Sequence, residues 1–575
     1  MNLSARSPRS RFRAGSLLLW AGPLLFLLLL YVFPLGSILK VGFSRAGEDA
    51  AAPLLQAWTS PITRRALWFT IWQAGLSTLL TLLLGLPGAY LFARFTFRGK
   101  RLLQALAGIP FVMPTLVVAA AFQSLLGPRG WVNLGLMNLM DVSAPPIQFS
   151  QTLGAILIAH VFYNTTIVLR TVGDFWARLD PDLTAAARSL GASAWQAATR
   201  ITLPLLFPAI LTAALLVFIF DFSSFGVILI LGGPTFTTLE VEIFYQTTSL
   251  FNLPLAAALS VMQLVFNLAL TILYTRLSNR ISRPLSFRSK EITQRPLRGW
   301  GQRLAAGVAI IVIFSLLLTP LAALAVRSVT RLEPERGETR VDRGFTLDFY
   351  RALNDDARQS AFYGPPSEAI GTSLTYAAAT VLLSLLLGLP AAWALAHDSD
   401  ALLSRIFDPL IMLPMGTSAV TLGLGFIVAL SGPPFHLSTS PLLIPFAHTL
   451  VAFPFTVRSL TPALRSIEPR LRQAAAMLGA SPLKVIRYVD LPLIGRAMLV
   501  AATFAFTISL GEFGATAVIA RPEYATIPIA IYRFLGQPGA MNYGQALALS
   551  TILMLVCGGG LLAIERLRIA DIGEW

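Results

Sequence analysis

The chain has 575 residues, of which 55% are apolar and 13% are charged, and its net charge is +16. This composition excludes an ordinary soluble protein, because uncharged runs recur along the chain and about 20 apolar residues in a helix span a bilayer. The single cysteine, Cys557, excludes a disulfide framework and a thiolate metal site.

Twelve apolar runs predict twelve membrane-spanning helices, and therefore an all-α, multi-pass membrane protein. The first run is too long for the apolar core of a cleaved signal peptide, so we expect a retained anchor. The runs lie at residues 15–39, 66–93, 102–126, 151–169, 205–231, 251–275, 304–326, 370–396, 406–430, 442–457, 493–520 and 541–564.

The basic charge is concentrated in alternate loops. With twelve spans, the loops on the side that holds both termini carry 30 Lys and Arg against 12 Asp and Glu, whereas the opposite side carries 14 of each. Loops rich in Lys and Arg stay in the cytoplasm, so we expect both termini to be cytoplasmic. The charge then follows from membrane topology, and we expect membrane lipid but no nucleic acid as a partner.

Two polar stretches have the same pattern 288 positions apart: "AARSLGASAWQAATRITLPLLFPAI" begins at Ala186 and "AAAMLGASPLKVIRYVDLPLIGRAM" at Ala474. His160 and His448 have the same offset, although such histidines are more often packing residues than ligands. This self-similarity predicts two six-helix repeats of parallel topology. We expect a first repeat at 1–275, a basic cytoplasmic linker at 276–303 and a second repeat at 304–575.

Each stretch predicts a short helix, a tight bend and a second short helix. Pro181 and Pro469 suit the first position of a helix, and Gly191 and Gly479 suit a left-handed helix end. The Ser two residues after each Gly can cap the next helix. A pair of interfacial helices would explain one such loop. Two loops in register favour a rigid docking element for a two-fold partner.

These loops resemble the cytoplasmic signature loop of binding-protein-dependent ABC importer permeases. Its pattern opens with Glu-Ala-Ala, then has a Gly and ends in Ile-x-Leu-Pro. The matching residues are Ala186, Ala187, Gly191, Ile201, Leu203 and Pro204 in the loop 181–204, and Ala474, Ala475, Gly479, Val489, Leu491 and Pro492 in the loop 469–492. The Glu is absent, because Ala185 and Gln473 occupy its position.

The resemblance implies a type I ABC importer permease fold in a bacterial plasma (inner) membrane, as a fused pair similar to the permeases of thiamine and ferric-iron importers. It also implies an ATPase dimer that binds both loops and a periplasmic or lipid-anchored substrate-binding protein. The chain has no phosphate loop of the form G-x-x-x-x-G-K-[ST], so we expect a transport subunit that is not an enzyme and that holds no cofactor or metal. The alternative is an ion-gradient-driven secondary transporter with two parallel repeats.

Two carboxylates lie inside predicted spans, each near a repeated Phe-Gly pair. Charges at such depth usually face a bundle interior or a transport pathway. Because carboxylates and aromatic rings attract cations, we expect a cationic cargo such as thiamine or ferric iron. The alternative is that the acids lie near an interface or cap a broken helix. The candidate pathway residues are Asp221, Phe225, Glu512 and Phe513.

Overall fold

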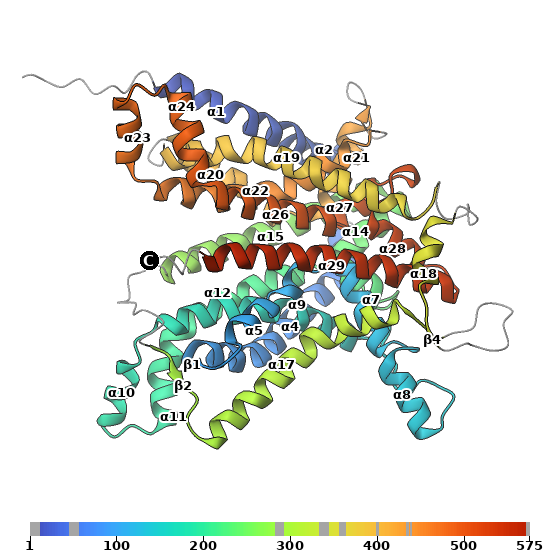
Figure 1. Ribbon diagram of the computed structural model, residues 1–575. Helices are drawn as coiled ribbons and strands as arrows, with labels where there is room; N and C mark the ends of the chain where they lie inside the picture. The colour runs from blue at the N-terminus through green and yellow to red at the C-terminus, as the bar shows by residue number, and fades with distance from the viewer. Residues whose placement is uncertain are drawn as a thin grey trace, which may run out of the picture. The chain divides into compact units, whose positions relative to one another are not determined.

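The computed structural model describes residues 12–44, 57–281, 293–332, 344–355, 364–397, 402–432, 436–437 and 440–570 (Figure 1). Parts of the segments used for the topology prediction lie outside the described residues. They are the N-terminal residues 1–11, the linker residues 282–292 and the C-terminal residues 571–575.

Helices make up nearly all of the described regular structure. In chain order they are α1 (Phe12–Leu27), η1 (Leu28–Val32), α2 (Phe33–Ser44), α4 (Pro61–Arg94), α5 (Lys100–Leu106), α6 (Ile109–Val112), α7 (Thr115–Leu126), α8 (Trp131–Met140), α9 (Leu153–Arg178), α10 (Asp182–Ser189), α11 (Ala194–Ala197), η2 (Ala198–Thr202), α12 (Leu203–Phe222), α13 (Gly226–Leu231), α14 (Leu239–Thr248), α15 (Leu253–Ile281), α17 (Trp300–Arg327), α18 (Asp348–Arg351) and η3 (Ala352–Asn354).

The second half continues with α19 (Glu368–His397), α20 (Leu402–Met412), η5 (Leu413–Gly416), α21 (Ala419–Leu430), α22 (Leu443–Ser466), α23 (Pro469–Met477), α24 (Pro482–Val485), η7 (Ile486–Asp490), α25 (Leu491–Leu493), α26 (Gly495–Gly511), α27 (Gly514–Ile519), η8 (Pro522–Tyr524), α28 (Ile527–Leu535) and α29 (Ala540–Ala570). Two short strand pairs complete the structure: β1 (Phe95–Thr96) runs parallel to β2 (Arg295–Pro296), and β3 (Thr330–Arg331) runs antiparallel to β4 (Gly344–Phe345).

The described residues contain nine helices that are long and apolar enough to cross a membrane, or up to twelve if each of three bent helix pairs is one span. This confirms the predicted all-α, multi-pass protein with about twelve spans. The bent pairs are Lys100–Val112 with Thr115–Met140 (106°), Phe407–Gly416 with Ala419–Leu430 (102°), and Pro482–Leu493 with Gly495–Gly511 (71°).

The chain forms two compact units that interleave in sequence. The second-half unit takes its described residues from Met1–Ser44, Asp356–Ile529 and Gly559–Trp575, and the first-half unit from Arg45–Asp355 and Ala530–Gly558. In the second-half unit α1 packs on α19 and α2 on α21, whereas in the first-half unit α17 packs on α7 and α4. The first span of each half therefore packs in the unit built mainly from the other half. The division at 276–303 stays a prediction about the sequence repeats.

The 288-residue offset holds from element to element in the repeated region. The bounds of α11, η2 and α13 map onto those of α24, η7 and α27, and α9 and α22 end at equivalent residues. Between Arg178 and Leu231 and between Ser466 and Ile519 the numbering therefore keeps step without an insertion, with two local differences. The helix α23 begins one residue earlier than the equivalent of α10, and the stretch equivalent to α12 is divided into α25 and α26 at Ile494.

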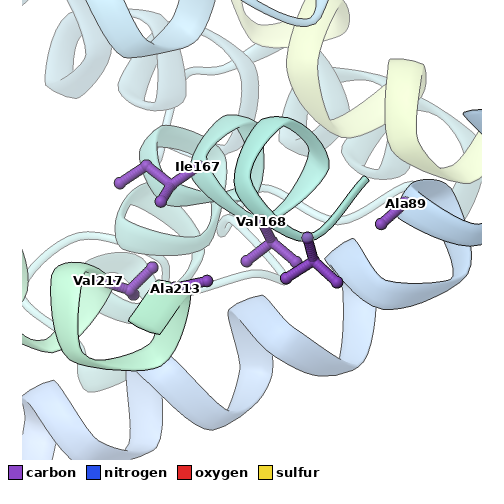
Figure 2. Packing of buried hydrophobic residues seen from close by; sticks show 6 residues of the cluster. Ala89, Ile167, Val168, Ala213 and Val217 are labelled. Atoms are coloured by element: carbon purple, nitrogen blue, oxygen red, sulfur yellow. The ribbon is translucent and has the colours of Figure 1, made fainter. Parts of the chain in front are cut away.

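Small residues allow the long helices of the first-half unit to approach closely. Gly85 on α4 faces α9, where a Cβ at this position would lie 2.7 Å from the Val168 Cβ. The equivalent contact joins α19 to α22, because a Cβ on Gly388 would lie 2.6 Å from Thr456 Cγ2. A buried apolar cluster between α4, α9 and α12 includes Ala89, Ile167, Val168, Val172, Ala213 and Val217 (Figure 2).

Candidate functional site

The first repeated loop (181–204) bends where α10 ends at Ser189. The Ala192 N–H donates to the Ala187 carbonyl (3.0 Å) and the Gly191 N–H to the Arg188 carbonyl (3.1 Å). These two bonds form a Schellman helix end, which needs a left-handed residue. Gly191 supplies it, with a φ of +91°. The predicted bend is therefore present at the predicted residue.

The second repeated loop (469–492) has the same bend. The Ala480 N–H donates to the Ala475 carbonyl (3.0 Å), the Gly479 N–H donates to the Ala476 carbonyl (3.0 Å), and Gly479 has a φ of +80°. Among the described residues, no atom lies within 4 Å of a Cβ built on either Gly191 or Gly479. Glycine is therefore required here by the backbone conformation and not by lack of space.

The Leu-Pro pair of each loop follows a wide helical turn. Residues 198–202 and 486–490 form single π-turns, in which the Leu203 N–H bonds the Ala198 carbonyl and the Leu491 N–H bonds the Ile486 carbonyl. Pro204 and Pro492 come next and have no N–H to donate, and a proline ring crowds the carbonyl four residues earlier. A wider turn relieves that crowding, and in each loop the π-turn ends directly before the Leu-Pro pair.

Both loops lie at one end of the long helices of their own unit (Figure 1). Their apolar side chains are exposed there. Leu190 and Leu478, which directly precede the two bend glycines, are each 89% exposed. Of the predicted contact residues, the exposed ones are Ala186, Gly191, Leu203, Pro204, Ala474, Gly479 and Pro492, and the half-buried ones are Ala187, Ile201, Ala475, Val489 and Leu491. An exposed apolar surface on a polar loop is typical of an interaction site.

Asp221 is buried inside the first-half unit, with 1% of its surface exposed. Asn164 Nδ2 donates to its Oδ1 (2.6 Å), and His160 Nδ1 lies 3.5 Å from the same oxygen. Gln73 Nε2 donates to the Asp221 carbonyl (2.8 Å), and His160 Nε2 bonds the Ser224 hydroxyl (2.8 Å). These contacts hold together α4, α9 and the break between α12 and α13.

Glu512 is buried inside the second-half unit at the break between α26 and α27. Its carboxylate accepts the N–H groups of Ala515 (2.9 Å) and Thr516 (3.1 Å) and the Thr516 hydroxyl (2.7 Å). His448 Nε2 lies 3.5 Å from Glu512 Oε2, and His448 Nδ1 bonds the Ser509 hydroxyl (2.8 Å). Because the first N–H groups of a helix lack partners within it, these contacts are those of a helix cap.

The contacts around Asp221 and those around Glu512 have the same arrangement, with one difference. In both, the imidazole bridges two positions three residues apart, with Nδ1 toward the first and Nε2 toward the second. The carboxylate occupies the first position in one repeat and the second in the other. The equivalent pairs are His160 and His448, Asp221 and Ser509, and Ser224 and Glu512. Sequence reasoning missed this pairing, although the repeated histidines carried the signal.

The structure also places the two candidate phenylalanines at the helix breaks. Phe225 and Phe513 are both buried, and the Phe225 ring centre lies 5.2 Å from that of Phe244. The substrate-pathway role of these rings and of the two acids stays a prediction. In the described part of the chain, no group of three or more His, Cys, Asp or Glu could hold a metal ion.

Comparison with known proteins gives consistent matches. A family model described as "binding-protein-dependent transport system inner membrane component" matches residues 81–283 and 384–564. The thiamine transport system permease protein ThiP of Salmonella typhimurium is 27% identical over 527 residues, which cover 89% of this chain and 91% of that protein. ThiP of Haemophilus influenzae is 26% identical over 556 residues, with 95% of each chain covered.

Among solved structures, a bacterial ABC transporter involved in the import of the acidic polysaccharide alginate matches with a TM-score of 0.38 and 20% identity. The match covers 47% of this chain and 96% of that chain.

Proposed function

Since the chain belongs to the binding-protein-dependent transport system inner membrane components, we propose that it is the membrane-spanning subunit of an ABC importer driven by a separate ATPase dimer. The observation that carries the proposal is the pair of loops with the same Schellman end and the same π-turn. Two copies of the same solvent-exposed bend suit a partner that presents two equivalent clefts.

The loop surfaces support docking of a protein partner. Each presents large apolar side chains around the bend, with Trp195 in the first loop and Met477 and Leu483 in the second mostly exposed. Burial of apolar surface is the main favourable term in protein association, at about 25 cal/mol per Å². On this proposal the loops and both termini lie on the cytoplasmic side of a bacterial inner membrane. A periplasmic or lipid-anchored binding protein delivers the substrate on the opposite side.

We propose thiamine as the cargo. The support comes from the thiamine permeases described above, which align with nearly the whole chain. Neither is an iron permease, so ferric iron has no support from them. The two buried acids do not decide the charge of the cargo. Glu512 accepts three hydrogen bonds beside His448, whereas Asp221 accepts one from Asn164 beside His160, and its Oδ2 has no partner among the described residues.

The test is transport by proteoliposomes that contain this chain together with an ATPase and a binding protein from the same organism. We expect uptake of radiolabelled thiamine that requires both ATP and the binding protein. Excess unlabelled thiamine should compete, whereas ferric iron should not. Uptake that continues without ATP and stops when an ionophore collapses the ion gradient would instead support the secondary transporter.

A further inference from the structure

The two repeated loops have one backbone but are held by different side chains. In the first loop, Ser193 and Gln196 form a capping box: the Ser193 hydroxyl accepts the Gln196 N–H (3.1 Å) and the Gln196 side chain accepts the Ser193 N–H (2.9 Å). In the second loop, Ser481 is followed by Pro482, and within the described chain its hydroxyl accepts no capping bond. The second loop therefore lacks the capping box that stabilises the first.

The second loop has instead an ion pair across its bend. Arg472 Nε on α23 donates to Asp490 Oδ1 at the end of η7, at 2.7 Å. The Asp490 side chain is fully buried, and that of Arg472 is 21% exposed. The Arg472 guanidinium also lies 5.5 Å from the centre of the Trp393 ring on α19. One side chain thus ties the first helix of the loop to the foot of α25 and α26 and to a neighbouring span.

The first loop has threonines at both equivalent positions. The Thr184 hydroxyl donates to the Pro181 carbonyl (2.7 Å) and the Thr202 hydroxyl to the Ala197 carbonyl (3.5 Å). Each bond stays within one arm of the loop. The ion pair, by contrast, joins the two arms of the second loop on either side of the bend at Gly479.

We infer that Arg472 and Asp490 make the second loop a rigid connection between the ATPase and α26, whereas the equivalent threonines of the first loop, Thr184 and Thr202, each bond within one arm. A displacement of α23 by the docked ATPase passes directly to the foot of the span, because a short bond in a buried site resists being stretched. The inference rests on the proposed function. Arg472 acts here as a positioning residue.

The test uses a double variant that gives the second loop the residues of the first, Arg472→Thr with Asp490→Thr. Removing both charges avoids leaving one buried and unpaired, which would itself be strongly destabilising. The first readout is thiamine transported per ATP hydrolysed in proteoliposomes. We expect this ratio to fall at least about threefold, in the range typical of substitutions along a coupling path. A merely structural role would lower the yield or the melting temperature and leave the ratio unchanged.

The second readout is amide hydrogen exchange of residues 469–490 in the assembled transporter. Exchange should become faster in the double variant and approach that of residues 181–202. An unchanged exchange rate would show that the pair does not brace the loop, and an unchanged transport ratio would show that the brace does not couple. Either result overturns the inference. A wild-type transporter without ATP-driven uptake would instead overturn the proposed function.

A conservative variant covers the case in which the double variant does not assemble. Arg472→Lys keeps the charge but loses the planar guanidinium that faces Trp393. We expect a transport ratio between those of the wild type and the double variant. A wild-type ratio in Arg472→Lys, together with unchanged exchange, would contradict the proposed role of the guanidinium.

Discussion

Substitution of the two bend glycines tests the role of the repeated loops. Gly191 and Gly479 have φ values of +91° and +80°. For an L-residue, the left-handed region costs about 1–2 kcal/mol. Since a Cβ at either position meets no described atom within 4 Å, contacts with the rest of the protein add nothing to this cost. A penalty of about 1–2 kcal/mol lowers the ratio of bent to unbent loop by a factor of about 5–30.

The cost should rise from Asn through Ala to Val at both positions. Asn tolerates the left-handed region better than other side chains, and β-branched residues tolerate it least. Gly495→Ala is the matched control, because Gly495 also has open space around it but lacks a positive φ. We expect this control to keep wild-type transport.

The assay is ATP-driven thiamine uptake by the assembled transporter, measured beside the amount of chain inserted into the membrane. Uptake should fall in the order Asn, Ala, Val while insertion stays normal, and the Gly191→Val, Gly479→Val double variant should lose most. Wild-type uptake and wild-type substrate-stimulated ATPase activity in that double variant would refute the reasoning, because the bend would then have no part in coupling.

Substitutions at Gly85 and at Glu512 test the helix packing and one of the two buried acids. Gly85→Ala should destabilise the chain by about 1–3 kcal/mol, because the new Cβ would overlap that of Val168. Thermal unfolding in detergent should then show a lower midpoint than for the control Gly559→Ala, since Gly559 has open space around it. Glu512→Ala should cost about 1–3 kcal/mol of stability and so also lower the midpoint, because two buried N–H groups lose their acceptor. Glu512→Gln keeps one acceptor oxygen: normal uptake with a lower midpoint supports the cap, whereas lost uptake with an unchanged midpoint supports the predicted pathway role.

The features that the sequence determined by itself are local. Apolar length predicts the spans because a bilayer has a fixed thickness. The bends at Gly191 and Gly479 could be placed because a left-handed helix end selects glycine whatever lies around it. The order of elements in the two repeats could be predicted from the constant offset. The Leu-Pro pairs were recognised as part of the motif, but the π-turns before them were not predicted.

Only the tertiary structure decided which distant segments meet. The exchange of first spans, with α1 on α19 and α17 on α7, depends on which apolar helix faces fit together. The pairings of His160 with Asp221 and of His448 with Glu512 cross more than 60 residues. In the sequence, Arg472 and Asp490 are two ordinary polar residues of a loop. Only the fold shows that the Asp490 carboxylate is buried and paired with Arg472. Such contacts depend on packing between helices, which no local pattern encodes.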